Sequence, residues 1–338
     1  MTEQPTLTDG TVTLRPWRDD DVTVAVSGHD EEIDRWVGAR PTRAQVAADV
    51  EAWRRGWTDG RRAAGFVIVA GDEVVGSCGL RVVSSGTGDL TWSLYAGHRG
   101  RGYAARAIRV LTDWALTETD QQGLGLGRVQ ATVEPGNASG LRVATRAGMR
   151  REGVRRLAPG TGERTEATEH VVLARLASDP PLSDPRSFRS LLNSFLPRKR
   201  AIAQMLVRDH EDRVLLCHLT YKRDWDLPGG VVEVGESPQL AVTREVKEEL
   251  GLSLKAGSLL LTDWLPPWGG WDDALCLVFD GGRHDAGILD DLVRQEREIR
   301  TAEFCTPDQV RERCADFTAR RIEAALASSG GAYTESGR

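Results

Sequence analysis

The stretch that decides the fold of the C-terminal half covers residues 225–252 and reads WDLPGGVVEVGESPQLAVTREVKEELGL. Its second part predicts a helix with a marked beginning and a marked end. Ser237 is a suitable N-cap, Pro238 fits the first helical position, and Gly251 fits the position just past the last turn. These signals predict a helix over 238–250 that follows a glycine-containing loop.

The predicted helix gathers carboxylates beside its apolar side. At about 100° per residue, Val242, Val246 and Leu250 form one apolar stripe that faces the core. Three glutamates fall within an arc of about 100° beside this stripe, and they are Glu245, Glu248 and Glu249. Like charges this close repel one another by about a few tenths of a kcal/mol per pair, unless a hard divalent cation accepts their oxygens.

A solvated acidic face is the ordinary explanation of a segment such as EVKEE. The surrounding residues favour a functional site instead, because four further positions complete a longer motif: Gly230, Glu236, Arg244 and Gly251. The whole stretch resembles the Nudix box at every defining position, including both terminal apolar sites. The resemblance implies an α/β/α sandwich that uses Mg²⁺ or Mn²⁺ to cleave a nucleoside diphosphate linked to another moiety.

The resemblance also implies residue roles. It assigns metal binding to Glu245, Glu248 and Glu249, with the Gly229 carbonyl as a further ligand. It also pairs Arg244 with Glu236, which fixes the loop. Independently of the family, carboxylates suit this chemistry because the divalent ions that they bind neutralise phosphate oxygens and lower the pKa of water. The catalytic candidates in this half are Glu248, Glu249, Arg244 and Glu298, the last standing where many relatives have a further acid.

The identity of the substrate is not readable from the box. The loop TDWLPPWGGWDD carries Trp264, Trp268 and Trp271. An exposed aromatic ring there would stack on a nucleobase, whereas buried rings would only cover the sheet. Both interpretations stay open at this point.

The N-terminal half contains a second glycine-rich motif. The segment HRGRGYAARAI follows a predicted strand over 90–96 and opens a predicted helix over 104–117. A glycine-rich turn at a helix N-terminus presents free N–H groups to an anion and suits a pyrophosphate. The candidate binding residues are Arg99, Gly100, Arg101, Gly102, Tyr103 and Ala104.

Two other segments give this motif a family context. The run Val133-Glu134-Pro135-Gly136-Asn137, followed by Gly148-Met149, resembles the end of the core in GNAT acetyltransferases. The opening TVTLRPWRDDDV resembles the ribosomal-protein N-acetyltransferase branch. The resemblance spans nearly all of residues 9–176. It implies a GNAT fold with a mixed central sheet, an Arg99–Ala104 loop that binds the pyrophosphate of acetyl-CoA, and Asn137 near the pantetheine.

The N-terminal half departs from the family pattern at two places. Relatives usually carry Ser three residues after this Asn, where the present chain has Gly140. The predicted strand over 90–96 also offers no acid that would deprotonate an amine. Glu134 is the candidate general base, although a structural role would explain it equally well.

Length and charge place these motifs in two domains. The 338 residues suit about two domains. We expect a GNAT domain over 1–176, a Pro- and Ser-containing linker over 177–196, a Nudix domain over 197–325 and a disordered tail over 326–338. A short helix over 188–196 within the linker would dock on one domain.

Charge and hydropathy limit the partners. Residues 1–176 carry 23 basic and 23 acidic residues and residues 177–196 carry two of each, so the net charge of −6 lies beyond residue 196. Neither half is basic, which gives no reason to expect a nucleic-acid or membrane partner. Without a run of about 18 apolar residues, we expect a cytoplasmic protein with reduced cysteines.

The sequence therefore predicts a bifunctional enzyme, with acetyl-CoA, a nucleotide-type diphosphate and an amine of unknown identity as its small-molecule partners. The alternative is a Nudix hydrolase whose GNAT domain only binds acetyl-CoA as a sensor.

Overall fold

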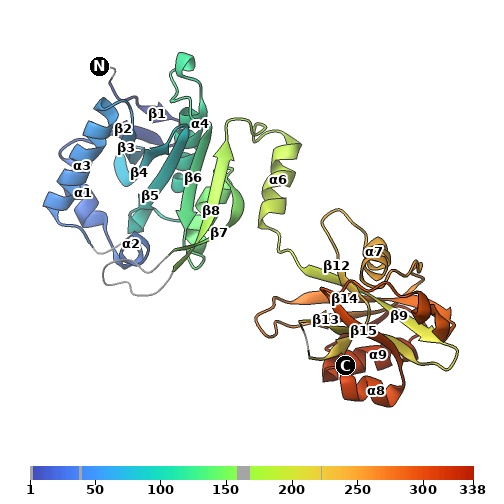
Figure 1. The fold of residues 1–338 in the computed structure, drawn as a ribbon. Helices are drawn as coiled ribbons and strands as arrows, with labels where there is room; N and C mark the ends of the chain where they lie inside the picture. The colour runs from blue at the N-terminus through green and yellow to red at the C-terminus, as the bar shows by residue number, and fades with distance from the viewer. Residues whose placement is uncertain (1–2, 38–39, 158–167, 222) are drawn as a thin grey trace. The chain divides into compact units, whose positions relative to one another are not determined.

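The computed structural model describes residues 3–37, 40–157, 168–221 and 223–338. The chain divides into two compact units, Met1–Leu196 and Pro197–Arg338 (Figure 1). Both combine helices with a mixed sheet, as the sequence predicts for each half. Within the described ranges, none of the helices is long and apolar enough to cross a membrane.

The first unit is built on one sheet in the order β1-β2-β3-β4-β5-β6-β8-β7. Its strands are β1 (Leu7–Thr8), β2 (Thr13–Pro16), β3 (Ala63–Ala70), β4 (Glu73–Ser84), β5 (Thr87–Leu94), β6 (Arg128–Val133), β7 (Arg150–Leu157) and β8 (Thr168–Leu176). Neighbouring strands are antiparallel except for β5 and β6, which run parallel. Gly71, with φ of 60°, makes the tight turn between the antiparallel strands β3 and β4.

Helices cover both faces of this sheet. They are α1 (Asp21–Gly28), α2 (Glu31–Val37), α3 (Arg43–Thr58), α4 (Tyr103–Leu116), α5 (Ala138–Arg146) and α6 (Pro185–Phe195). Adjacent strand residues face opposite sides, and β3 shows this directly. Gly65 leaves room for Trp53 of α3, whereas Phe66 on the other face meets Trp114 of α4 at a ring-centroid distance of 5.9 Å.

The parallel strands β5 and β6 separate along their length. They pair only where Thr87–Asp89 meets Arg128–Gln130, although β5 continues to Leu94 and β6 to Val133. Beyond this short paired segment the two strands no longer share backbone hydrogen bonds. The separation opens the sheet at the carboxyl ends of the two strands, next to the N-terminus of α4.

The second unit is a sheet between two helical layers. Its main path runs β11-β10-β9-β14-β13-β16, with β12 paired to β9 and β15 to β10. The strands are β9 (Arg200–Asp209), β10 (Val214–Leu219), β11 (Trp225–Asp226), β12 (Gly229–Val231), β13 (Leu259–Leu265), β14 (Ala274–His284), β15 (Ile299–Cys305) and β16 (Ala332–Glu335). The helices are α7 (Pro238–Leu250), α8 (Pro307–Arg313) and α9 (Asp316–Ala327).

Strand β9 shows why the second unit has two cores. Met205 and Val207 pack in one hydrophobic cluster with Val246 of α7. Leu206, which points the other way, packs in a second cluster with Ile322 of α9. The alternation along one strand therefore produces the expected α/β/α sandwich.

The segment that we expected to be a linker forms α6 and belongs to the first unit. Asp184 caps the helix by accepting a hydrogen bond from the Arg186 N–H, and Pro185 occupies the first turn. The Arg151 N–H donates to the Ser194 hydroxyl at 3.1 Å, and Phe195 packs against the core of the first unit. The first compact unit consequently extends beyond the expected boundary at residue 176.

The expectation of a disordered tail over 326–338 is wrong. Residues 332–335 form β16, which pairs in parallel with residues 261–264 of β13. The Ser- and Gly-rich composition predicts disorder, but the free edge of β13 supplies hydrogen-bond partners that the local sequence does not reveal. The tail is therefore a structural part of the second unit.

Candidate active sites

Helix α7 has the ends and the buried stripe that the sequence predicts. The Ser237 hydroxyl accepts a hydrogen bond from the Leu240 N–H at 3.4 Å, and Gly251 ends the helix with φ of 72°. The three apolar positions of the stripe, Val242, Val246 and Leu250, are completely buried. This packing fixes the direction in which the neighbouring glutamates project.

Arg244 is the centre of an ion-pair network on α7. Its Nε and Nη2 atoms donate to the two oxygens of Glu236 at 3.0 Å each. Its Nη1 atom donates to Glu245 and to Glu248, also at 3.0 Å. The predicted Arg244–Glu236 pair is therefore present, and it ties the loop before α7 to the middle of the helix. These bonds lower the pKa of Glu236.

Glu249 is the buried member of the acidic cluster, with only 5% of its surface exposed. Burial raises its pKa to about 8, and the charges of Glu245, Glu298 and Asp226 add to this effect. The Gly229 N–H donates to its Oε2 atom at 3.1 Å, which opposes part of the shift. A buried carboxyl group that is surrounded by other carboxylates needs a nearby cation to stay ionised.

Gly229 and Gly230, which precede α7, allow the backbone to lie close to the carboxylates of Glu245 and Glu249. A Cβ atom on Gly230 would lie 2.6 Å from the Cδ atom of Glu245, so a larger residue would displace that carboxylate. Gly229 adopts φ of 138° and presents its N–H to Glu249. The Gly229 N–H therefore links this loop to the acidic cluster through a hydrogen bond, and metal binding by the Gly229 carbonyl stays a prediction.

The donor set fits a divalent cation by its chemistry. Oxygen atoms of Glu245, Glu248 and Glu249 project from one helix, and Glu298 lies close enough to raise the pKa values of Glu245 and Glu249. Among the described residues, no three His, Cys, Asp or Glu side chains are already gathered as a metal-binding group. Arg244 holds Glu245 and Glu248 instead.

A cavity of about 290 Å³ lies beside this cluster in the second unit. Gly229, Gly230 and Tyr221 form part of its wall, and burial together with the charges of Glu249 and Glu298 raises the pKa of Tyr221. The rest of the wall includes Trp268 and Trp271, which are 54% and 56% exposed. Trp264 is only partly exposed and does not line the cavity. Two of the three tryptophans are therefore available for contact with a ligand.

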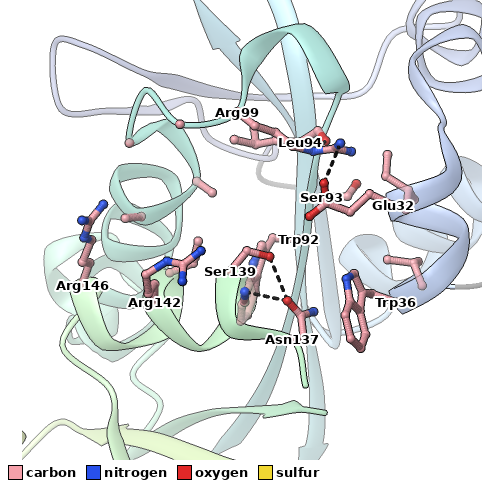
Figure 2. A pocket seen from close by; sticks show the side chains of 18 residues that line it. Glu32, Trp36, Trp92, Ser93, Leu94, Arg99, Asn137, Ser139, Arg142 and Arg146 are labelled. Atoms are coloured by element: carbon pink, nitrogen blue, oxygen red, sulfur yellow. Dashed lines mark hydrogen bonds and ion pairs between the residues drawn. The ribbon is translucent and has the colours of Figure 1, made fainter. Parts of the chain in front are cut away.

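The first unit has its own cavity, of about 220 Å³, where β5 and β6 separate. Figure 2 shows it between the end of β5, the loop before α4 and the helix α5. Gly100 and Gly102 both adopt positive φ, at 78° and 82°, and α4 starts at Tyr103. This backbone presents the N-terminus of α4 to the cavity, as the glycine-rich motif predicts.

The six predicted loop residues do not all face this cavity. Arg99, Gly100, Gly102 and Ala104 line it, whereas Arg101 and Tyr103 do not. The Arg99 guanidinium donates two hydrogen bonds to Asp30, both at 2.7 Å, and one to Glu32 at 3.1 Å. Its charge is therefore balanced by these two protein carboxylates, of which Figure 2 shows Glu32.

Asn137 and Glu134 lie at the end of β6. The Asn137 Oδ1 atom accepts from the Gly140 N–H at 2.8 Å and from the Ser139 hydroxyl at 2.9 Å, and it thereby caps α5 (Figure 2). Asn137 lines the 220 Å³ cavity and a second cavity of about 490 Å³, which Glu134 also lines. Glu134 and Asn137 thus share the wall of one cavity, and Asn137 also lines the other.

Comparison with known proteins agrees with this division. The chain matches the acetyltransferase (GNAT) domain family over residues 11–150 and the NUDIX domain family over residues 197–326. A MutT-like protein of Streptomyces ambofaciens is 31% identical over 134 residues, which cover 38% of this chain and 78% of the relative.

The chain belongs to the Nudix family. Its Nudix domain is also 33% identical to the nucleoside triphosphatase NudI of Escherichia coli over 115 residues, 31% of this chain and 77% of NudI. The GNAT domain is 29% identical to the uncharacterized N-acetyltransferase p20 of Bacillus licheniformis over 93 residues. That match covers 27% of this chain and about half, 49%, of p20.

Several residues that line the two cavities could not be identified from the sequence alone. In the GNAT domain, Arg142 and Arg146 stand one turn apart on α5 and line the 220 Å³ cavity (Figure 2). Their spacing of four residues was the available signal. In the Nudix domain, Gln204 and Arg321 line the 290 Å³ cavity. They lie 117 residues apart, so no local pattern joins them.

Proposed function

We propose that the Nudix domain is a divalent-metal-dependent hydrolase that cleaves a nucleoside diphosphate linked to another moiety. The observation that carries this proposal is the buried Glu249 carboxylate, 5% exposed, among the further carboxylates of α7 and Glu298. Such a cluster is unfavourable without a cation and becomes favourable when Mg²⁺ or Mn²⁺ accepts its oxygens. The similarity of this domain to NudI, a nucleoside triphosphatase, supports a nucleotide substrate.

In this proposal the acidic residues of α7 bind the metal and Arg244 positions the loop before α7. Glu245, Glu248 and Glu249 would hold the metal, and the Gly229 N–H keeps the Glu249 carboxylate in place. A bound divalent ion would neutralise phosphate oxygens and activate the attacking water. Arg244, through its bidentate contact with Glu236, would keep the loop before α7 against the helix.

Glu298 is the further acid of the proposal. It is exposed and lies directly before β15, near Glu249 and Glu245. We assign it to metal binding or proton transfer, because an exposed carboxylate beside the cluster can exchange protons with solvent.

A substrate screen of the full chain tests the hydrolase proposal. It would include dinucleoside polyphosphates, nucleotide sugars, ADP-ribose, NAD and nucleoside triphosphates, each with Mg²⁺, with Mn²⁺ and with a chelator. We expect hydrolysis of at least one compound, and its loss when the metal is chelated. Metal-independent turnover, or binding without any turnover across the whole panel, would contradict the proposal.

For the GNAT domain we propose acetyl-CoA-dependent N-acetylation of an amine. The supporting observation is the cleft between β5 and β6, which places the glycine-rich turn of α4 and the cap of α5 around one cavity. Glu134, on the wall of the adjoining 490 Å³ cavity, is the candidate base for the acceptor amine.

The alternative for the GNAT domain is a sensor that binds acetyl-CoA without transferring the acetyl group. Thiol release from acetyl-CoA with a panel of amines, covering peptide N-termini, amino sugars and small metabolites, separates the two. Thiol release that depends on one class of amine supports the transferase, and Glu134→Gln should then slow it. Tight binding of acetyl-CoA without thiol release would support the sensor.

A further inference from the structure

We infer that the 290 Å³ cavity of the Nudix domain holds the base of the nucleotide and selects a base with a keto oxygen through an N–H group of Arg321. The inference rests on the proposed hydrolase function, because it names the part of the substrate that reaches beyond the diphosphate. It is carried by a buried network, an aromatic wall and the position of the cavity.

The buried network fixes the Arg321 guanidinium at the floor of the cavity. Arg321 is 2% exposed, and its Nε atom donates to the Oδ2 atom of Asp263 at 2.9 Å. Its Nη1 atom donates to the Oε1 atom of Gln204 at 3.0 Å. Its Nη2 atom is buried and has no hydrogen-bond acceptor among the described residues. An unmet buried donor is costly, so an acceptor from a ligand would be favoured there.

Asp263 is itself held rigidly. It is fully buried, and its Oδ1 atom accepts from the Thr334 hydroxyl at 2.8 Å and from the Gly337 N–H at 2.9 Å. Both donors belong to the C-terminal tail, where Ser336 also lines the cavity. Because Asp263 cannot rotate freely, the guanidinium that it binds keeps one orientation.

Gln204 cannot supply the missing acceptor. Its Oε1 atom already accepts from Arg321 and from the Cys276 thiol, and its Nε2 atom donates to Asp226 at 2.8 Å. Both polar atoms of the Gln204 amide therefore already have hydrogen-bond partners within the buried network. Because Arg321 lines the cavity, we expect a ligand there to supply the acceptor for Nη2 without disturbing these bonds.

The aromatic wall suits a flat ring. Trp268 and Trp271 flank Gly269 and Gly270, whose φ values of 56° and 86° make a tight turn. The two tryptophans exchange both backbone hydrogen bonds, at 3.1 and 2.8 Å, so their side chains project from the same face of the turn. Arg200 covers one ring at 4.9 Å from the Trp271 centroid. Stacking of a base on such a wall tolerates any base, so it contributes affinity rather than selectivity.

The cavity also has the right position for a base. Gly229 and Gly230 line it, and the same two residues contact Glu249 and Glu245 of the acidic cluster. A nucleotide with its base in the cavity would therefore extend its phosphates toward the carboxylates.

The chemistry of the floor predicts the preferred base. A fixed N–H group donates a hydrogen bond to a keto oxygen such as guanine O6, whereas the amino group that adenine presents at the same place is itself a donor and cannot accept it. We therefore expect keto bases to bind more tightly than adenine. Guanine and adenine differ little in size, so they test the donor rather than the volume.

The test measures binding of GMP and AMP to the full chain without metal, by calorimetry. We expect GMP to bind at least about tenfold more tightly than AMP. The nucleotide of 2,6-diaminopurine, which keeps the two rings but replaces the oxygen at position 6 with an amino group, should bind like AMP. Equal affinities for GMP and the diaminopurine nucleotide would overturn the inference.

Two variants locate the effect. Arg321→Lys keeps a cation for Asp263 and removes the Nη2 donor, so the preference for GMP over AMP should fall to less than about threefold. Trp268→Ala should weaken both nucleotides by roughly tenfold and leave their ratio unchanged. Tyr333→Ala, an exposed aromatic residue outside the cavity, is the matched control and should change neither. If Arg321→Lys does not fold, the diaminopurine comparison in the wild-type chain still decides.

The two proposals fail in different ways. Binding that prefers GMP, without hydrolysis of any nucleotide, would refute the hydrolase and leave the base pocket standing. Hydrolysis of adenine and guanine nucleotides at equal rates, with equal affinities for GMP and AMP, would refute the base selection and leave the hydrolase standing.

Discussion

Arg99 and Asp30 form a bidentate ion pair, with both nitrogen–oxygen distances at 2.7 Å. The pair joins the start of α2 to the loop that precedes α4, and the Arg99 Nε atom also donates to the Leu94 carbonyl at 3.0 Å. Arg99 therefore acts as a positioning residue for the glycine-rich loop. The hydrogen bonds from Arg99 lower the pKa of Asp30 to about 2.

This pair predicts a loss of stability in acid. A carboxyl with a depressed pKa stabilises the fold above its ordinary value near 3.8, and that contribution disappears as the pH falls through about 2. Since the Asp30 side chain is 31% exposed, we expect Asp30→Asn to lower the free energy of unfolding by only about 1 kcal/mol at pH 6. Urea unfolding at pH 6, 4, 3 and 2 checks this. A difference between wild type and variant that stays constant over this range would contradict the assignment.

Glu249→Gln should abolish hydrolysis and leave the fold intact. The glutamine keeps an oxygen for the Gly229 N–H and replaces a buried carboxyl group whose ionisation is unfavourable, so the melting temperature should not fall. Loss of a metal ligand should lower the rate on the identified substrate by at least about a thousandfold. Glu312→Gln, at an exposed position of α8, is the matched control. A Glu249→Gln variant with more than about a tenth of the wild-type rate is incompatible with the assigned role.

Gly102→Asp should weaken acetyl-CoA binding more than it weakens the fold. The new carboxylate would stand at the N-terminus of α4, where it repels a pyrophosphate. Gly102 has φ of 82° and open space around its Cβ position, so the cost to the fold is about 1 kcal/mol of backbone strain.

Gly60→Asp is the matched control for Gly102→Asp. Gly60 has φ of 70° and equally open surroundings but does not line the cavity. Calorimetry with CoA should show roughly tenfold weaker binding or worse for Gly102→Asp and wild-type binding for Gly60→Asp. Unchanged affinity in Gly102→Asp would remove the loop from the binding site.

The Nudix domain should not consume the CoA of the GNAT domain. CoA contains a diphosphate, and fusion raises its concentration near the second site. However, residues 214–226, VLLCHLTYKRDWD, do not resemble the extra motif that CoA-specific Nudix enzymes carry ahead of the box. Incubation of the full chain with CoA and Mg²⁺ should yield no phosphopantetheine. Its formation at the rate of the best nucleotide substrate would show that the first domain delivers CoA to the second.

The sequence predicted those features that depend on neighbouring residues. The caps and the apolar stripe of α7 follow from helical spacing, so Ser237, Gly251 and Val246 could be placed without a structure. The role of Arg99 could not be predicted, because its partner Asp30 lies 69 residues earlier. The Arg321–Asp263 pair spans 58 residues and is buried by tertiary packing alone. Composition also gave a wrong prediction for the tail, because β16 is ordered by its pairing with β13.

The attachment of β16 to β13 also sets an order of assembly. Residues 332–337 leave the ribosome after the whole box helix, so a nascent chain that has not yet reached them carries the carboxylates but lacks two donors to Asp263. The acidic cluster can thus form earlier in synthesis than a rigid Arg321. Any peptide fused after Arg338 during expression would begin two residues beyond Gly337, whose N–H group helps to hold the Asp263 partner of Arg321.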